Sequence, residues 1–155
     1  MVVIIDYGVG NLFSLRSSFA AIGVEAIVSS DPDEIRNGDH IILPGVGAFG
    51  DAAKKLQDSG MAELVKELAA SGKPIMGICL GMQLLFEKSY EYGEHEGLGL
   101  IKGSVRPIAD VIPEDLKIPQ IGWNALQFRF PNGPEVSPIF KYIENGDHVY
   151  FVHSF

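Results

Sequence analysis

The chain has 155 residues, 46% of them hydrophobic and 21% charged, a size and composition that fit one compact domain with a buried core. Its formal net charge of −8, with only 12 Lys and Arg residues scattered along the sequence, argues against binding to a nucleic-acid backbone. Its single cysteine excludes an internal disulfide and a multi-thiolate metal site, and fits a reducing, cytoplasmic location.

The amino-terminal segment is expected to be a strand. Residues 2–5 form a short apolar run before Asp6, without the basic region and cleavage site of a signal peptide. The most apolar stretch of the chain, residues 74–86, is too short to span a bilayer and is interrupted by glycines and by Gln83. No membrane segment is therefore predicted.

Strands and helices are expected to alternate over the first half of the chain. The predicted strands cover residues 2–5, 24–28, 40–43 and 75–78, and the predicted helices cover residues 11–22, 52–56 and 61–70. Gly72 and Pro74 end the last of these helices, since Gly suits the position after a helix and Pro cannot continue one. This order predicts an α/β fold, with a doubly wound and mostly parallel sheet in three layers. In such folds, ligands bind at the carboxyl ends of the strands.

The second half of the chain is predicted to contain strands and turns with few helices. Residues 98–105, 118–130 and 148–152 are predicted strands, separated by turns rich in Pro, Gly and Asn, and residues 89–97 are predicted to form a charged loop. We expect an antiparallel extension, so that residues 1–155 form a single domain. Because the last strand runs to Phe155 without a closing helix, the sequence is expected to be incomplete at its carboxyl end.

The candidate catalytic motif lies after the fourth predicted strand. Residues 77–81 read Gly-Ile-Cys-Leu-Gly, the thiol form of a nucleophile elbow, before a helix predicted at residues 82–87. Such a turn strains the backbone at Cys79, and the glycines leave room for crossing segments. The helix amino terminus would favour a thiolate and a developing oxyanion. A lone cysteine is more often a small buried hydrophobic residue. The elbow favours a nucleophile, without choosing between amidase, esterase and peptidase chemistry.

Two motifs carry a resemblance to a known family. Residues 77–83, Gly-Ile-Cys-Leu-Gly-Met-Gln, resemble the signature of the class I (triad) glutamine amidotransferases, and residues 44–47, Pro-Gly-Val-Gly, resemble their oxyanion strand. The resemblance implies that Cys79 is the nucleophile and that Gln83 recognises bound glutamine, although an isolated Gln more often lies on a solvated helix face. It also implies an oxyanion hole at the backbone of Gly45, Val46, Gly47 and Leu80. Since the oxyanion strand of this family rearranges, Gly47 is its expected hinge.

The order of five motifs resembles one branch of this family, the glutaminase subunits that work with a cyclase in histidine biosynthesis. The further motifs are at residues 6–11, 121–124 and 150–154. The resemblance implies L-glutamine as substrate, no cofactor or metal, and a heterodimer with a cyclase (β/α)8 barrel that receives the ammonia. It implies a partner interface at Asn11, Trp123, Asn124 and Tyr150, and a glutamine pocket that includes Ser154 and Phe155. Taken alone, a tryptophan is more often a core residue.

One part of the family pattern is absent from the sequence. The family completes its triad with a His-Pro-Glu motif, and no such motif occurs in these 155 residues. The chain has four histidines, His40, His95, His148 and His153. Each is better explained by a surface or core role than as the general base, and His153 fits a role in a pocket or in packing. A chain of these 155 residues is therefore predicted to lack its general base and to hydrolyse glutamine poorly.

Two alternatives stay open at this point. The first is a thiol hydrolase or stress-response protein of the related elbow-bearing superfamily, and the second is a non-catalytic domain that binds a partner through the region of Trp123. Gln83 and the glycine-rich segment at residues 44–47 favour amidotransfer over the first alternative, and covalent labelling of Cys79 would distinguish it from the second.

Overall fold

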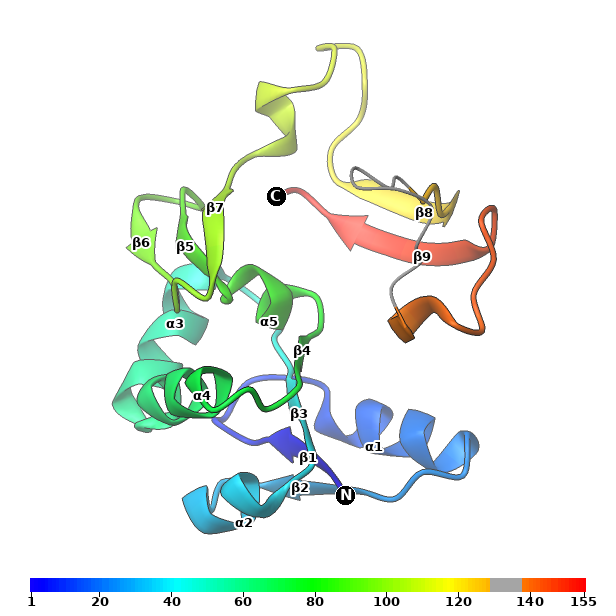
Figure 1. Cartoon of the computed structure of the whole chain (residues 1–155). Helices are drawn as coiled ribbons and strands as arrows, with labels where there is room; N and C mark the ends of the chain where they lie inside the picture. Colours follow the sequence, from blue (N-terminus) through cyan, green and yellow to red (C-terminus); the bar gives the residue numbers. More distant parts are fainter. Residues whose placement is uncertain (129–137) are drawn as a thin grey trace. The chain divides into compact units, whose positions relative to one another are not determined.

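The computed structural model describes residues 1–128 and 138–155 (Figure 1). The chain forms two compact units, Met1–Arg106 and Pro107–Phe155, and each is described by itself. The end of the predicted strand 118–130 lies outside the described residues from residue 129 onward. The expectation of a single domain over residues 1–155 stays a prediction.

The first unit is built on a parallel sheet of four strands in the order β2-β1-β3-β4. These strands are β1 (Val2–Ile5), β2 (Ala26–Ser29), β3 (His40–Leu43) and β4 (Ile75–Gly77). All four strands were predicted, with shifts of one or two residues at the ends of β2 and β4. The chain adds β2 on one side of β1 and β3 on the other, so a topological switch point lies between the carboxyl ends of β1 and β3.

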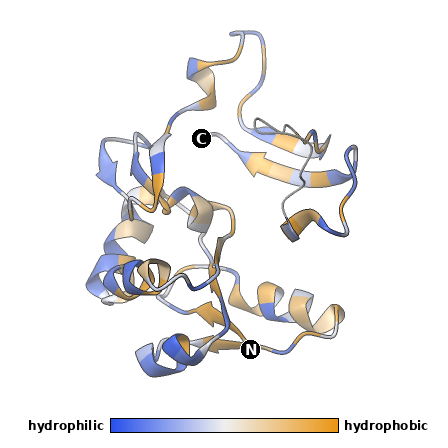
Figure 2. Ribbon diagram, in the orientation of Figure 1, coloured by the Kyte–Doolittle hydropathy of each residue, from blue (hydrophilic) through white to orange (hydrophobic). Residues whose placement is uncertain are grey.

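Side chains that alternate along β1 bury its two faces against different helices. Ile4 belongs to a cluster with the apolar face of α1 (Leu12–Ala21), while Val3 and Ile5 pack in the larger cluster with α3 (Phe49–Asp58) and α4 (Met61–Ala70). Because both faces are covered, every residue of β1 is hydrophobic (Figure 2). The predicted three-layer arrangement is confirmed.

The segment after the elbow differs from the prediction. The expected helix at residues 82–87 is replaced by a four-residue helix, α5 (Leu80–Gln83), and a strand, β5 (Phe86–Ser89). Beyond Gln83, the carbonyl groups pair with a later segment of the chain instead of with a further helical turn. The Leu98 N–H donates to Leu84 O, and the Leu100 and Ile101 N–H groups donate to Leu85 O, over 2.8–2.9 Å.

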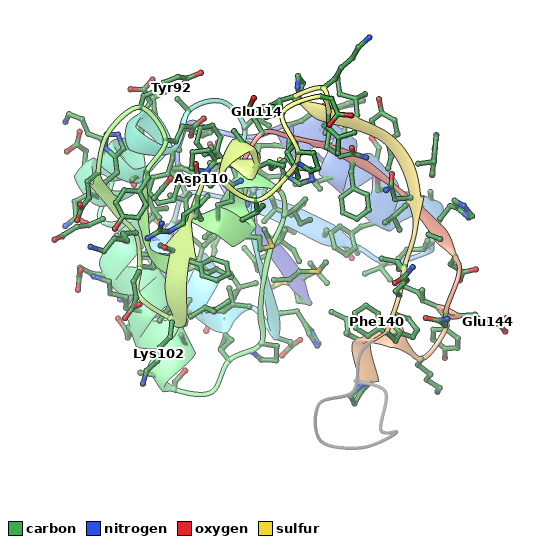
Figure 3. All side chains as sticks on the ribbon, turned by 90° about the horizontal axis from the view of Figure 1, so that it is seen from above. Tyr92, Lys102, Asp110, Glu114, Phe140 and Glu144 are labelled. Atoms are coloured by element: carbon green, nitrogen blue, oxygen red, sulfur yellow. The ribbon has the colours of Figure 1, made fainter. Side chains whose placement is uncertain are left out.

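A small three-stranded sheet completes the first unit, in the order β6-β5-β7. Strand β6 (His95–Glu96) pairs antiparallel with β5, so the predicted loop at 89–97 contains a short strand. Strand β7 (Ile101–Val105) pairs parallel with β5 and begins three residues later than predicted. Tyr92, in the turn between β5 and β6, has a left-handed backbone with φ 53° and lies on the surface (Figure 3).

The second unit is a β-hairpin with short 3₁₀ turns, η1 (Ile108–Asp110) and η2 (Pro138–Phe140). Strands β8 (Gln120–Ala125) and β9 (His148–His153) pair antiparallel, which confirms the antiparallel prediction for the last two predicted strands. It is wrong for the predicted strand 98–105, because β7 pairs parallel with β5 in the first unit. In η2, the ring of Phe140 lies 4.9 Å from that of Phe128 (Figure 3). No helix in residues 1–128 and 138–155 has both the length and the apolar character that crossing a membrane requires.

The short helix α2 (Pro32–Asn37) was not predicted. It begins at the cap residue Asp31, whose side chain accepts from two backbone N–H groups, and its only buried side chain is Ile35.

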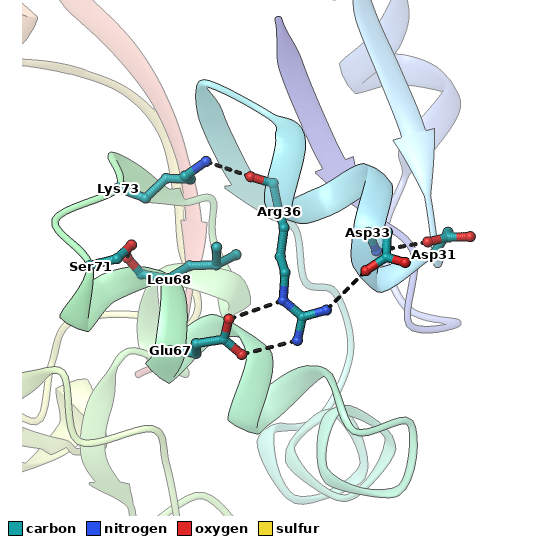
Figure 4. A network of polar contacts seen from close by, with 7 residues as sticks. All are labelled: Asp31, Asp33, Arg36, Glu67, Leu68, Ser71 and Lys73. Carbon is teal, nitrogen blue, oxygen red and sulfur yellow. Dashed lines mark hydrogen bonds and ion pairs between the residues drawn. The ribbon is translucent and has the colours of Figure 1, made fainter.

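A polar network joins α2 to the end of α4 (Figure 4). The Arg36 guanidinium donates two hydrogen bonds of 3.0 Å to the Glu67 carboxylate and a third to Asp33. The Lys73 ammonium donates to Arg36 O and Gly38 O at 2.6 Å, which satisfies carbonyl groups at the carboxyl end of α2. The hydrogen bond from Arg36 lowers the pKa of the Glu67 carboxyl below its ordinary value.

Candidate active site

Cys79 lies on a strained turn between β4 and α5. Its φ of 55° and ψ of −121° place a non-glycine residue in a sparsely populated region, at a cost of about 1–3 kcal/mol. The predicted backbone strain is thus confirmed, and the thiol is exposed. Because α5 has only four residues, the helix dipole behind the thiol is small, and the nearby backbone N–H groups carry more of the electrostatics than the prediction assumed.

Three glycines allow the elbow to pack directly on the end of β3. A Cβ added to Gly77 would lie 2.5 Å from Met82 Cα, and a Cβ on Gly81 would lie 1.9 Å from Leu43 O. A Cβ on Gly45 would lie 2.5 Å from Gly81 N and 2.9 Å from the backbone of Leu80. Only hydrogen fits at these positions, which confirms that the flanking glycines make room for a crossing segment.

The segment that follows β3, residues 44–48, carries unused hydrogen-bond donors. Within the described part of the chain, no acceptor takes a hydrogen bond from the N–H groups of Gly45, Val46, Gly47 or Leu80. Gly47 has φ +87°, and no atom lies within 4 Å of its Cβ position. Backbone donors that are free and close to a nucleophile are what an oxyanion requires. We call residues 44–48 the oxyanion loop.

Both ends of the oxyanion loop are held by side chains that the sequence reasoning did not single out. The Tyr7 hydroxyl donates to Pro44 O at 2.7 Å in a buried position, and burial raises the pKa of Tyr7, so the hydroxyl stays protonated. At the other end, the Glu91 carboxylate accepts from Phe49 N–H at 2.6 Å, where α3 has no cap from its own side chains. No local sequence pattern predicts either contact, because each joins residues about 40 positions apart in the sequence.

The other candidate residues of the first unit lie on α5 and at the start of α1. Gln83 is the last residue of α5 and is half-buried, and its N–H donates to Cys79 O. The Asn11 side chain accepts from Ser14 N–H and so caps α1.

The remaining candidates belong to the second unit. Trp123 and Tyr150 are directly opposite each other across β8 and β9, with ring centroids 5.6 Å apart, and Trp123 is 68% exposed. Asn124 accepts a hydrogen bond from the Gln120 side chain. Ser154 O accepts from Ile108 N–H, and Phe155 O lies 2.9 Å from His153 Nδ1.

The histidines do not form a base beside the elbow in any contact that the structure describes. His40 begins β3, at the opposite end of the parallel sheet from Cys79. The His95 ring lies against Gly50 and Phe49 at the start of α3. His148 and His153 are in β9 of the second unit, where His153 lines an apolar pocket with Ile108 and Ile121, among other residues. Among the described residues, no group of three or more His, Cys, Asp and Glu side chains is placed to hold a metal ion.

A parallel α/β sheet with an exposed thiol on an elbow and free N–H groups in a neighbouring glycine loop defines a class of thiol enzymes that act on carbonyl groups. The family model for "Glutamine amidotransferase class-I" matches residues 3–155. The chain belongs to the class-I glutamine amidotransferase family.

Several curated relatives share a single name, imidazole glycerol phosphate synthase subunit HisH. The protein from Sulfurimonas denitrificans is 49% identical over 156 residues, which cover 100% of this chain and 72% of the relative. The proteins from Lactococcus lactis and Aquifex aeolicus are 50% and 48% identical, and the matches cover 99% of this chain and 72% and 70% of the relatives. A crystal structure of a glutamine amidotransferase matches 98% of this chain and 71% of its own, with a TM-score of 0.71. At 18% sequence identity, that likeness supports the fold alone.

Proposed function

We propose that this chain is a glutaminase subunit that hydrolyses L-glutamine to glutamate and ammonia through a thioester on Cys79. The observation that carries the proposal is the contact between the strained elbow and the oxyanion loop, whose backbone N–H groups have no partner among the described residues. The relatives named as subunits of imidazole glycerol phosphate synthase support this activity and a cyclase (β/α)8 barrel as the partner that uses the ammonia.

The proposed reaction has two covalent steps. The Cys79 sulfur adds to the side-chain amide carbon of glutamine. The oxyanion that forms accepts hydrogen bonds from Leu80 N–H and from backbone N–H groups of the oxyanion loop. The C–N bond then breaks, the thiol proton ends on the departing nitrogen, and ammonia leaves a glutamyl thioester. Water adds to the thioester and the C–S bond breaks, which gives glutamate and the free thiol. We assign glutamine recognition to Gln83, Ser154 and Phe155.

One face of the β8–β9 hairpin is apolar and exposed, which supports a binding surface for a partner protein. Ile121 is opposite Val152 and Trp123 is opposite Tyr150, so these four side chains share one face of the hairpin, and each is more than half exposed. An exposed apolar cluster of this kind is typical of interaction sites. We therefore propose a heterodimer interface at Trp123 and Tyr150. Asn124, on the other face of β8, and Asn11 of the first unit are added to the proposed interface from the family resemblance alone.

The proposal includes three expectations for the chain as a whole. Residues 1–155 are proposed to act as one amidotransferase domain in the cytoplasm, where the single thiol stays reduced. The general base and its carboxylate are not supplied by any His-Pro-Glu motif in this sequence. A polypeptide of these 155 residues is therefore expected to release little ammonia from glutamine, and brisk turnover would contradict the missing base.

Covalent labelling tests the proposal without requiring turnover. We expect an L-glutamine analogue with a diazomethyl ketone in place of the carboxamide to alkylate Cys79 at least about tenfold faster than its D enantiomer. Intact mass and peptide mapping would measure the reaction, and Cys79→Ser is the control because the chain has no other cysteine. Equal labelling by both enantiomers would favour a general thiol hydrolase, and absence of labelling would favour a non-catalytic domain.

A further inference from the structure

The loop after β1 contacts Pro44, the first residue of the oxyanion loop, through a hydrogen bond and through packing. Pro44 is fully buried, and its carbonyl oxygen accepts a hydrogen bond from the Tyr7 hydroxyl at 2.7 Å. Among the described residues, no other donor reaches Pro44 O. From the other side, a Cβ on Gly10 would lie 2.9 Å from Pro44 Cβ, so the backbone of this loop packs directly on the proline ring.

The direction of the Pro44 carbonyl also fixes the direction of a possible oxyanion donor. A peptide group is planar and its C=O and N–H bonds point in opposite directions when it is trans. With Pro44 O held by Tyr7, the N–H of Gly45 in the same peptide group points away from Tyr7. That N–H has no acceptor in the described part of the chain, and its residue packs against Leu80 and Gly81 of the elbow.

Loss of the hydroxyl would leave Pro44 O buried without a donor, which is unfavourable. Rotation of the peptide group would relieve that state by turning the carbonyl toward other donors or water. The same rotation would turn the Gly45 N–H away from its present direction, because the two bonds move together.

We propose that Tyr7 is a positioning residue for the oxyanion loop, acting through the peptide group that joins Pro44 and Gly45. This inference rests on the proposed glutaminase function. Among the described residues, Tyr7 makes no contact with the thiol, and its 6% exposure leaves it little room to meet a substrate. Because burial raises the pKa of Tyr7, the hydroxyl remains a donor throughout the neutral range.

The test compares two reactions of Cys79 in the whole chain. The p-nitrophenyl γ-ester of L-glutamate acylates the thiol through a tetrahedral oxyanion, and its leaving group needs no protonation by a general acid. Iodoacetamide alkylates the same thiol by displacement of iodide, with no oxyanion at its carbonyl. The ratio of the acylation rate to the alkylation rate therefore isolates the contribution of the oxyanion loop from the reactivity of the thiol.

We expect Tyr7→Phe to lower this ratio about tenfold, since small misplacements of catalytic groups have effects of this order. Gly10→Ala, which presses on Pro44 from the other side, should lower it in the same direction. Ile35→Val is the matched control, because it trims a buried side chain on α2 with a small loss of stability and is expected to leave the ratio unchanged.

The outcomes separate this inference from the proposed function. If the native chain prefers the glutamate ester over p-nitrophenyl acetate and Tyr7→Phe keeps the native ratio, the inference is overturned and the function stands. If Ile35→Val lowers the ratio as much as Tyr7→Phe, the effect is general destabilisation and the inference is again overturned. If the native chain shows no preference for the glutamate ester, both fail.

Discussion

Gly81→Ala should separate the elbow from the oxyanion loop. The added Cβ would lie 1.9 Å from Leu43 O and 2.9 Å from Pro44 C, and real Cβ contacts are not found below 3.0 Å. The two backbones must therefore move apart by at least about 1.1 Å, which is the difference between the 3.0 Å limit and the 1.9 Å distance to Leu43 O. Leu43 O also accepts the Ile78 N–H at 3.0 Å, so the shift weakens a hydrogen bond of the sheet.

The expected cost has a stability part and a rate part. Overpacking costs about 1–3 kcal/mol and the weakened hydrogen bond about 1 kcal/mol, so we expect Gly81→Ala to lose about 2–4 kcal/mol in urea unfolding. A displacement of about 1 Å at the site should slow acylation by the glutamate ester about a hundredfold.

Gly72→Ala is the control, since Gly72 has φ +82° with no atom within 4 Å of its Cβ position. It should lose about 1 kcal/mol through backbone strain and keep the native acylation rate. The steric argument would be refuted if Gly81→Ala unfolded at the native urea concentration and acylated at the native rate.

Three further predictions concern the loop, the polar network and the hairpin. Gly47→Val places a branched side chain at φ +87° and should slow acylation about tenfold, because it restricts the oxyanion loop. Gly60→Val is the control, since Gly60 has a similar φ of +76° between α3 and α4, and it should keep the native acylation rate. Equal acylation rates for the two variants would refute the hinge role of Gly47. Because the folded-state pKa of Glu67 is lowered, its stabilisation is present above the unfolded value of about 4.3 and is lost as the pH falls through the folded value. The urea midpoint of Glu67→Gln should thus lie below the native one at pH 7 and converge with it as the pH falls below the folded-state pKa, and a constant difference would contradict the ion pair. Trp123→Ser should weaken binding of the cyclase barrel by about 2 kcal/mol in calorimetry, with Tyr142→Ser as an exposed control, and unchanged affinity would remove this face from the interface.

Local patterns in the sequence were sufficient for the sheet and the elbow. The strands of the parallel sheet are short, mainly apolar runs, and α3 and α4 repeat their apolar residues at helical spacing. The spacing of Gly77 and Gly81 around Cys79 predicted a crowded, strained turn, and the φ of Cys79 agrees with it.

The errors arose where distant residues decide the local structure. The run at residues 82–87 has helical periodicity, but Leu84 and Leu85 give their carbonyl groups to residues 98–101 instead. A window of neighbouring residues does not contain that competition. Helix α2 was missed because six residues with one buried side chain show no period, although the Asp31-Pro32 pair was a usable start signal.

The supports of the oxyanion loop could not be predicted for a related reason. Tyr7 lies 37 positions before Pro44 in the sequence, and Glu91 lies 42 positions after Phe49, within a segment that contains several acidic residues. Nothing local distinguishes these two side chains from their neighbours. These contacts form only in the folded chain, where the loops after β1 and β3 meet at the same edge of the parallel sheet and the turn between β5 and β6 reaches the start of α3.

The left-handed backbone at Cys79 favours glycine, whereas the proposed reaction requires a thiol at the same position. Glycine would occupy that φ without strain, so a population of sequences selected only for thermal stability would drift toward glycine at this position. Under the proposed function, a thiol persists there only while nucleophilicity is under selection. The residue at position 79 in a descendant of this chain would therefore record whether the lineage still uses the elbow for catalysis or keeps the fold alone.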